Sequence, residues 1–153
     1  MATAEEERNI ENIMRWSQYY NTKDLVRFVY ECYTPDCVAY AMGNVELDSP
    51  EIFLEAERQV LAAAPKRYMR LDHLTANGNN MTVECTLLDP DRGDDFAIPW
   101  VAVFTMRDGK IAIDRTYADW TKWPGVSDFS HHKWGANTDH CVVCRTAKFD
   151  PPD

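Results

Sequence analysis

The sequence lacks any long apolar run. No apolar segment approaches the roughly 20 residues that a helix needs to cross a bilayer, so we expect no membrane span. The N-terminus begins Met-Ala-Thr-Ala-Glu-Glu-Glu-Arg, which is acidic and has no apolar stretch of the secretory kind. We therefore expect a cytoplasmic protein.

Positive charge is scarce. The chain has 16 Lys and Arg against 25 Asp and Glu, which gives a formal net charge of −9. Such a surface repels phosphate backbones and anionic lipid headgroups, so we expect neither nucleic acid nor membrane as a partner. Internal repeats and low-complexity runs are missing too, and 153 residues with 45% apolar content suit one domain around one core.

The cysteines are odd in number and lack the spacing of a disulfide framework, so we expect mostly free thiols. They are Cys32, Cys37, Cys85, Cys141 and Cys144. Near the C-terminus, His140, Cys141 and Cys144 carry the imidazole and thiolate groups that bind zinc. A partner Cys-x-x-Cys is lacking, so we expect no metal and keep these three residues as the alternative.

Apolar periodicity predicts helices in the first half of the chain. Over residues 4–21, Ile10, Ile13 and Met14 recur on one face. A second short helix is expected at 24–32. The third follows Ser49-Pro50, because Ser suits an N-cap and Pro suits a first helical turn, and it ends near 64. Short strands are expected at 37–42 and 45–47, and a turn at 33–36 because of Pro35.

The second half predicts four strands, at about 67–76, 80–89, 96–107 and 110–119. Asn77-Gly78 and Asp108-Gly109 are typical hairpin turns between them. Three helices against one face of a curved, mixed, mainly antiparallel sheet form an α+β domain, which we place over residues 1–124. Residues 125–153 are expected to form an irregular extension. A sheet curled around helices leaves a cone whose open mouth suits a small apolar ligand.

This order of elements resembles the NTF2-like superfamily, in particular its SnoaL-like and scytalone dehydratase-like branches, over roughly residues 5–120. The segment from Trp16 to Asp24 is similar to the Trp-x-x-x-Tyr-Asp-Ser-Lys-Asp at the end of the first helix of scytalone dehydratase. The resemblance implies that Tyr20 helps to hold a catalytic water. It also implies that Asn21, which stands in place of an Asp, is a pocket residue.

The resemblance implies further site residues. A second family tyrosine lies on the first strand, where Tyr40 is the nearest candidate and Ala41 the alternative by count from Pro35. A family histidine lies in a His-Φ-x-x-x-Gly segment, which His73 and the following residues fit. A second family histidine corresponds to Asp91 here.

The limonene epoxide hydrolase branch carries an Arg-x-Asp and a further Asp on its strands. The corresponding positions here are Cys85, Leu87 and Thr116, so we do not expect that chemistry.

Strand alternation predicts which of these side chains point inward. Met69, Leu71 and His73 share a face, whose apolar members make it the inner one. A buried histidine can exchange protons near neutral pH, although a core histidine bonded to backbone is the alternative. In the resembling family, the alternate residues of the last strand that correspond to Asp114 face the cone. The resemblance therefore implies that Asp114 points inward, where it could orient His73. The alternative for Asp114 is a surface carboxylate paired with Arg115.

Several apolar or small polar side chains suit the wall of a ligand pocket, with ordinary core packing as the alternative for each. They are Trp16, Met69, Cys85, Trp100, Phe104 and Thr116.

Together with the resemblance, these residues predict a cofactor-independent acid–base enzyme of the dehydratase, isomerase or cyclase type. Its substrate is expected to be a small hydrophobic oxygenated ring compound of the polyketide or terpenoid kind. In this hypothesis His73 moves a proton, Asp114 orients its imidazole, and Tyr20 and Tyr40 polarise a carbonyl. The alternatives are a non-catalytic protein that binds a small ligand and a dimerisation module. A homodimer is compatible with all three.

Overall fold

The computed structural model describes residues 1–41 and 45–125. These residues form helices and strands in the predicted order, together with two 3₁₀ turns that were not predicted. The predicted extension and its candidate metal ligands His140, Cys141 and Cys144 lie outside the described residues. The elements are α1 (Ala4–Thr22), α2 (Leu25–Cys32), β1 (Tyr33–Ala41), β2 (Val45–Leu47), α3 (Pro50–Ala63), β3 (Tyr68–Asn77), β4 (Asn80–Leu88), η1 (Pro90–Arg92), β5 (Ala97–Arg107), β6 (Lys110–Ala118) and η2 (Trp120–Lys122).

Local hydrogen bonds define where the helices begin. Thr3 and Glu6 form a capping box at α1, in which each side chain bonds the other's backbone N–H. The Ser49 hydroxyl accepts a 3.3 Å bond from the N–H of Ile52 at α3, as predicted. The inward face of α1 is carried by Ile13 rather than by Met14, which is 55% exposed. Among the described residues, no helix has the length and apolar character needed to cross a membrane.

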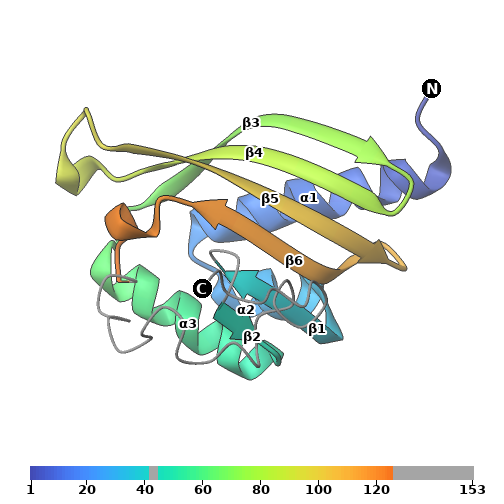
Figure 1. Ribbon diagram of the computed structural model, residues 1–153, viewed down its shortest axis with the longest axis horizontal. Helices are drawn as coiled ribbons and strands as arrows, with labels where there is room; N and C mark the ends of the chain where they lie inside the picture. The colour runs from blue at the N-terminus through green and yellow to red at the C-terminus, as the bar shows by residue number, and fades with distance from the viewer. Residues whose placement is uncertain (42–44, 126–153) are drawn as a thin grey trace, which may run out of the picture.

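The strands form one six-stranded sheet in the order β2-β1-β6-β5-β4-β3. Strand β1 runs parallel to β6 and every other neighbouring pair is antiparallel, so the prediction of an α+β fold with a mixed, mainly antiparallel sheet is confirmed. Figure 1 shows the sheet curving over α1, with α2 and α3 gathered near β1 and β2. The concave face of the sheet and the helices enclose the core.

Strand register places matching side chains of neighbouring strands in rows across this inner face. One row runs from Leu71 through Cys85 and Trp100 to Ala118. Another runs from Met81 through Phe104 and Asp114 to Ala39. The second row places a carboxylate beside wholly apolar neighbours.

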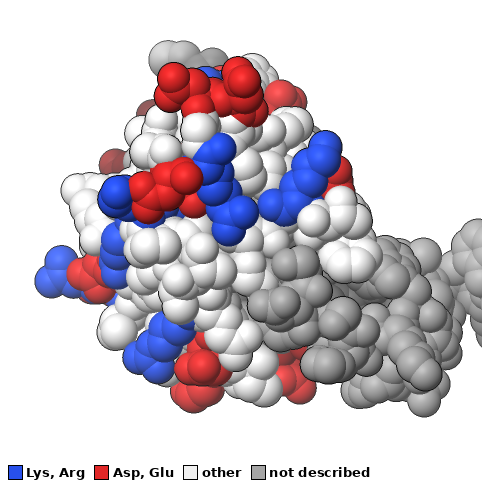
Figure 2. Space-filling view, turned by 90° about the vertical axis from the view of Figure 1, so that its left-hand side faces the viewer, with Lys and Arg blue, Asp and Glu red and all other residues white. Residues whose placement is uncertain are grey.

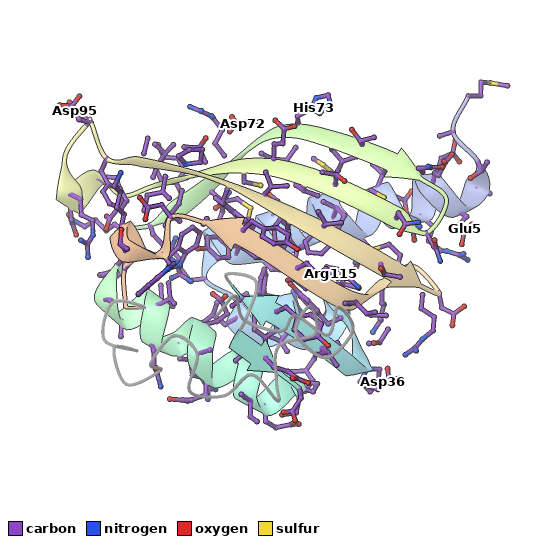
Figure 3. The ribbon with its side chains drawn as sticks, viewed as in Figure 1. Glu5, Asp36, Asp72, His73, Asp95 and Arg115 are labelled. Atoms are coloured by element: carbon purple, nitrogen blue, oxygen red, sulfur yellow. The ribbon has the colours of Figure 1, made fainter. Side chains whose placement is uncertain are left out.

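A β-bulge in β3 overturns the predicted orientation of His73. Leu71 lies opposite Cys85 and His73 lies opposite Glu84, so Asp72 is an extra residue that reverses the alternation. His73 is therefore exposed on the convex face, and its predicted place on the inner wall is wrong. Figure 3 shows His73 and Asp72 pointing away from the body of the protein.

Candidate functional site

Asp114 is the carboxylate of the inner wall. It lies on β6 between Ala39 of β1 and Phe104 of β5, and it is 5% exposed. Its Oδ2 accepts a 2.9 Å hydrogen bond from the Tyr33 hydroxyl, and its Oδ1 accepts a 2.9 Å bond from Thr116 Oγ1. The predicted inward orientation of Asp114 is confirmed, because the carboxylate is buried on the concave side.

Tyr33 connects Asp114 to the first helix. Its hydroxyl accepts a 3.0 Å hydrogen bond from Nε1 of Trp16, so Trp16, Tyr33 and Asp114 form one buried chain of hydrogen bonds. The sequence predicts a turn at residues 33–36, whereas the structure begins β1 at Tyr33. The sequence missed Tyr33 because Pro35 indicated a turn there, whereas β1 includes Pro35 and its register against β6 shifts between Tyr33 and Val38.

Burial determines the pKa values of Asp114 and Tyr33 in this chain of hydrogen bonds. It raises the pKa of Asp114 to about 6, against the opposing effect of the hydrogen bonds from Tyr33 and Thr116. Burial also raises the pKa of Tyr33 well above its usual value, and the charge of Asp114 adds to that rise. Asp114 can therefore exchange a proton near neutral pH while Tyr33 remains a neutral donor.

A second cluster of hydrogen-bonded polar side chains surrounds Arg67, which precedes β3. Its Nε donates a 2.8 Å hydrogen bond to the Tyr20 hydroxyl, and its Nη2 pairs with Glu57 at 3.0 Å. Burial raises the pKa of Tyr20, which therefore stays protonated. Arg67 and Glu57 were not among the predicted residues, because they come from separate elements and share no sequence spacing.

The two polar groups share one interior. The ring of Phe28 lies 5.6 Å from that of Tyr20 and 5.8 Å from that of Tyr33, measured between centroids. The negative charge of Glu57 is close enough to raise the pKa of Asp114 and of Tyr33. Phe28 thus links Tyr20, the partner of Arg67, to Tyr33, the partner of Asp114.

A cavity of about 530 Å³ opens where β5 begins, and Ile98 and Trp123 of the core form part of its wall. Its size is that of a small-molecule site, but it opens beside the start of β5 and not inside the cone, where buried side chains form one cluster. Arg92 and Lys122 add charge at its rim. Figure 2, which views the molecule from the side of the β4–β5 loop, shows cationic and anionic groups interleaved around uncharged surface.

Tryptophan rings separate this cavity from Asp114. Trp123 packs edge-on against Trp100, and Trp100 packs against Trp16, with 5.7 Å between centroids in both pairs. Trp16 is the donor to Tyr33. Trp100 and Trp16 thus lie between Trp123 at the cavity wall and the Tyr33–Asp114 hydrogen bond.

The structure does not bring His73 to Asp114. Two strands separate β3 from β6, so adjacent spacings of about 4.8 Å put the two strands roughly 14 Å apart. The two side chains also lie on opposite faces of the sheet. The predicted orientation of His73 by Asp114 is wrong for both reasons.

Tyr40 also lies away from the inner wall. In the parallel pairing of β1 with β6, Ala39 is the neighbour of Asp114 and Tyr40 is the neighbour of Arg115. Paired residues share a face and successive residues alternate, so the Tyr40 ring points to the convex side. The predicted position of Tyr40 in the pocket is wrong. Ala41, the alternative by count, is the inward residue, but it carries no hydroxyl.

Asn21 and Asp91 have structural partners. The Asn21 amide donates a 2.9 Å bond to the Met69 carbonyl and accepts a 2.7 Å bond from the Met69 N–H, so it holds the edge of β3. Asp91 is exposed and pairs with Lys66 at 2.7 Å. Both were predicted to bind substrate, and neither has its polar atoms on the inner wall.

The other predicted wall residues do lie in the interior. Trp16, Met69, Cys85, Trp100 and Phe104 are buried on the inner side, and the sulfur atoms of Met69 and Cys85 are 3.7 Å apart. Thr116 is half-buried beside Asp114. Whether these residues contact a substrate stays a prediction.

Comparison with known proteins identifies the family. The model of the SnoaL-like domain matches residues 13–113, which is most of the chain, and the protein therefore belongs to the SnoaL-like domain family. The predicted NTF2-like, SnoaL-like resemblance is confirmed. No curated protein matches the sequence significantly.

Three solved structures illustrate the likeness of fold. A candidate SnoaL-like polyketide cyclase from Jannaschia sp. CCS1 is 20% identical, with a TM-score of 0.69 over 78% of this chain and 90% of that one. IdmH, a candidate polyketide cyclase from Streptomyces antibioticus, is 16% identical, with a TM-score of 0.65 over 75% and 94%. An LEH-like epoxide hydrolase from M. tuberculosis is 18% identical, with a TM-score of 0.63 over 80% and 86%.

Proposed function

We propose that the protein is a cofactor-independent acid–base enzyme in which Asp114 transfers the proton. The observation that carries this proposal is a buried carboxylate with a pKa of about 6, held by Tyr33 and Thr116 on the inner wall of the cone. The apolar neighbours of Asp114 favour a small hydrophobic substrate. Polyketide cyclases among the similar folds support an oxygenated ring compound of the polyketide or terpenoid kind.

The proposed chemistry begins next to a carbonyl. The Asp114 carboxylate takes a proton from the adjacent carbon, which leaves an enolate and a protonated Asp114. Return of the proton to another carbon is an isomerisation. Loss of a β-hydroxyl, which leaves as water with the proton from Asp114, is a dehydration. Attack of the enolate carbon on a second carbonyl closes a ring, and Asp114 then protonates the new alkoxide.

Substrate entry is proposed through the 530 Å³ cavity at the start of β5. Trp123 lines that cavity and packs against Trp100, which packs against Trp16, so these three rings would have to move to admit a ring compound. The wall formed by Ile98 and Trp123 gives the substrate an apolar surface before it reaches Asp114.

The proposal can be tested with 1-tetralone, a bicyclic ketone whose C2 protons exchange slowly with water. In D₂O, Asp114 would remove a C2 proton, exchange it with solvent and return a deuteron, and NMR would follow the loss of the C2 proton signal. We expect the protein to accelerate this exchange and Asp114→Asn to lose on the order of 100-fold or more of that acceleration. Asp94→Asn, which changes an exposed loop residue, is the matched control. A folded Asp114→Asn protein that exchanges tetralone at the wild-type rate would contradict the proposal.

Ligand binding without turnover is the second candidate function. It is favoured by the separation of His73 from Asp114 and by the tryptophan rings between the cavity and Asp114. Under this function the protein binds 1-tetralone, as detected by ligand NMR, but wild type and Asp114→Asn leave its C2 exchange at the buffer rate.

A homodimer is also proposed. Tyr68 of β3 and Tyr117 of β6 are more than two-fifths exposed, and alternation puts both on the convex face of the sheet. Exposed aromatic side chains favour association. Light scattering of the purified protein should give twice the chain mass, and a chain mass at micromolar concentration would contradict it.

A further inference from the structure

Arg67 is the largest fully buried side chain among the described residues. Arginine is rarely buried in this way unless all its charge is paired. Here Nε bonds Tyr20 and Nη2 bonds Glu57, but Nη1 is buried with no hydrogen-bond partner in the described part of the chain. A buried donor without a partner is rare in native proteins and calls for an explanation, such as a ligand atom.

The guanidinium is held in one orientation before any ligand arrives. It lies over the ring of Tyr20, with 4.6 Å from its central carbon to the ring centroid. The Arg67 N–H donates to the carbonyl of Ala64 at 3.1 Å, and Lys23 donates to the Arg67 carbonyl. A donor fixed in this way loses little entropy when it binds an oxygen atom.

The free Nη1 belongs to the same interior as Asp114. Glu57, which pairs with Arg67, lies close enough to Asp114 to raise its pKa. Phe28 contacts the rings of both Tyr20 and Tyr33, the partners of Arg67 and Asp114. The Phe28 ring therefore lies between the partner of the donor and the partner of the proton acceptor.

The charges around Nη1 select the kind of oxygen that it can bind. Glu57 balances the positive charge of Arg67, and ionised Asp114 adds a further negative charge. Glu57 already pairs with Nη2 of the guanidinium, so an anionic ligand at Nη1 would lie beside that carboxylate and would lose its hydration on burial. A neutral carbonyl oxygen accepts a hydrogen bond and adds no charge.

We propose that the free Nη1 of Arg67 binds a neutral carbonyl oxygen of the substrate. The proposal rests on the function proposed for Asp114 and narrows its substrate class to neutral ring ketones. It assigns to Arg67 the task of binding and orienting the ligand, and to Asp114 the transfer of the proton.

Three bicyclic probes of similar size test this assignment: tetralin, 1-tetralone and tetralin-1-carboxylate. Their dissociation constants are measured by calorimetry or by quenching of tryptophan fluorescence. Tetralone is more soluble in water than tetralin, so an apolar site without a donor would prefer tetralin. We expect the wild-type protein to bind tetralone about tenfold more tightly than tetralin and to bind the carboxylate most weakly.

The principal variant is Arg67→Met combined with Glu57→Gln, which removes both members of the ion pair and leaves no buried charge unpaired. Arg70→Met with Asp72→Asn is the matched control, because it removes an ion pair on the exposed side of β3. Circular dichroism and thermal melting establish that both proteins fold. The first variant should lose the tenfold preference for tetralone, and the control should keep it.

Trp100→Phe is the second variant, because Nε1 of Trp100 is the other buried N–H that lacks a partner in the described residues. It removes that donor and keeps an aromatic ring between Trp16 and Trp123, and thermal melting establishes that the variant folds. Loss of the tetralone preference in Trp100→Phe, with retention in the Arg67 variant, would overturn the assignment to Arg67. Equal binding of tetralin and tetralone by the wild type would overturn it too, as would tightest binding of the carboxylate or no binding of any probe up to its solubility limit.

Asp114→Asn separates this inference from the proposed function. If it loses tetralone exchange but keeps the tetralone preference, both proposals stand. If it exchanges tetralone normally while the Arg67 variant loses the preference, the function proposed for Asp114 fails and the carbonyl site remains. If the preference persists in the Arg67 variant, the carbonyl site fails whatever the exchange rates are.

Discussion

The Tyr33 hydroxyl donates a 2.9 Å hydrogen bond to Asp114, which joins the first residue of β1 to the inner side of β6. The bond favours the ionised carboxylate, whereas burial favours its protonated form. The balance leaves the Asp114 pKa near 6 rather than near its ordinary 3.8. Tyr33 thus keeps a buried carboxylate available as a base at neutral pH.

Tyr33→Phe should therefore raise the pKa of Asp114 further. Because the base form is the carboxylate, the pH at which tetralone exchange reaches half its maximum should rise by about one unit. The Trp16 N–H would also lose its acceptor, at a cost of about 1–3 kcal/mol in the free energy of unfolding. The pH–rate profile and chemical denaturation measure the two effects.

Tyr30→Phe is the control for this variant, since the Tyr30 hydroxyl bonds Glu51 at the surface. An unchanged midpoint of the pH–rate profile in folded Tyr33→Phe would contradict the role given to this bond.

Asp114→Asn should change how stability depends on pH. The folded-state pKa of about 6 lies above the ordinary 3.8, so the folded protein binds a proton more tightly than the unfolded chain does. Wild-type stability then falls as pH rises from about 4 to about 6, by roughly 3 kcal/mol from this group. The Asp114→Asn variant has no carboxyl group at this position, so its stability does not fall for this reason. Its stability relative to wild type should increase by about this amount between pH 4 and pH 8, as measured by urea unfolding. A difference that stays constant over that range would show that Asp114 titrates normally.

Substitutions of Asn21 test whether this residue of the Trp16–Asp24 segment stabilises the fold through its bonds to Met69. Asn21→Ala removes both hydrogen bonds to the Met69 backbone and should cost about 1–3 kcal/mol in the free energy of unfolding. Asn21→Asp keeps the acceptor but sets a carboxylate against the Met69 carbonyl. Its loss of stability should be largest near pH 8 and smaller near pH 4, where a protonated Asp can donate. Gln18→Ala, an exposed position on the same helix, should stay within about 0.5 kcal/mol of wild type.

His73→Ala should have no effect on the proposed reaction. The side chain is exposed on the convex face, so both the unfolding free energy, within about 0.5 kcal/mol, and the tetralone exchange rate should match wild type. Exchange rates before and after the substitution provide the check. Loss of exchange in a folded His73→Ala protein would restore histidine chemistry and remove Asp114 from its central role.

The fold could be predicted because its signals are local. The Ser49 N-cap and the Gly78 and Gly109 turns each depend on a few adjacent residues, and the structure has them where the sequence predicts. Alternation along β6 divided its residues between two faces, and the family resemblance indicated that the face of Asp114 is the inner one. These features need no knowledge of distant contacts.

The site was harder to predict because its geometry depends on distant contacts. A single extra residue at Asp72 reverses the face of His73, and alternation of residue types along β3 does not reveal it. Arg67 meets Tyr20 and Glu57 only after three elements pack together, so no motif links them. The inward position of Asp114 could be predicted from the family resemblance, whereas its partner Tyr33 required the β1–β6 pairing.

Titration of the Asp114 carboxyl tests the central claim most directly and needs no substrate. Protein labelled with ¹³C at the aspartate carboxyl carbon is followed by NMR from pH 3 to pH 8, and Asp114→Asn identifies the resonance. The structure predicts that this resonance titrates with an apparent pKa of about 6. A midpoint at or below about 4 would contradict a carboxylate that exchanges protons near neutral pH.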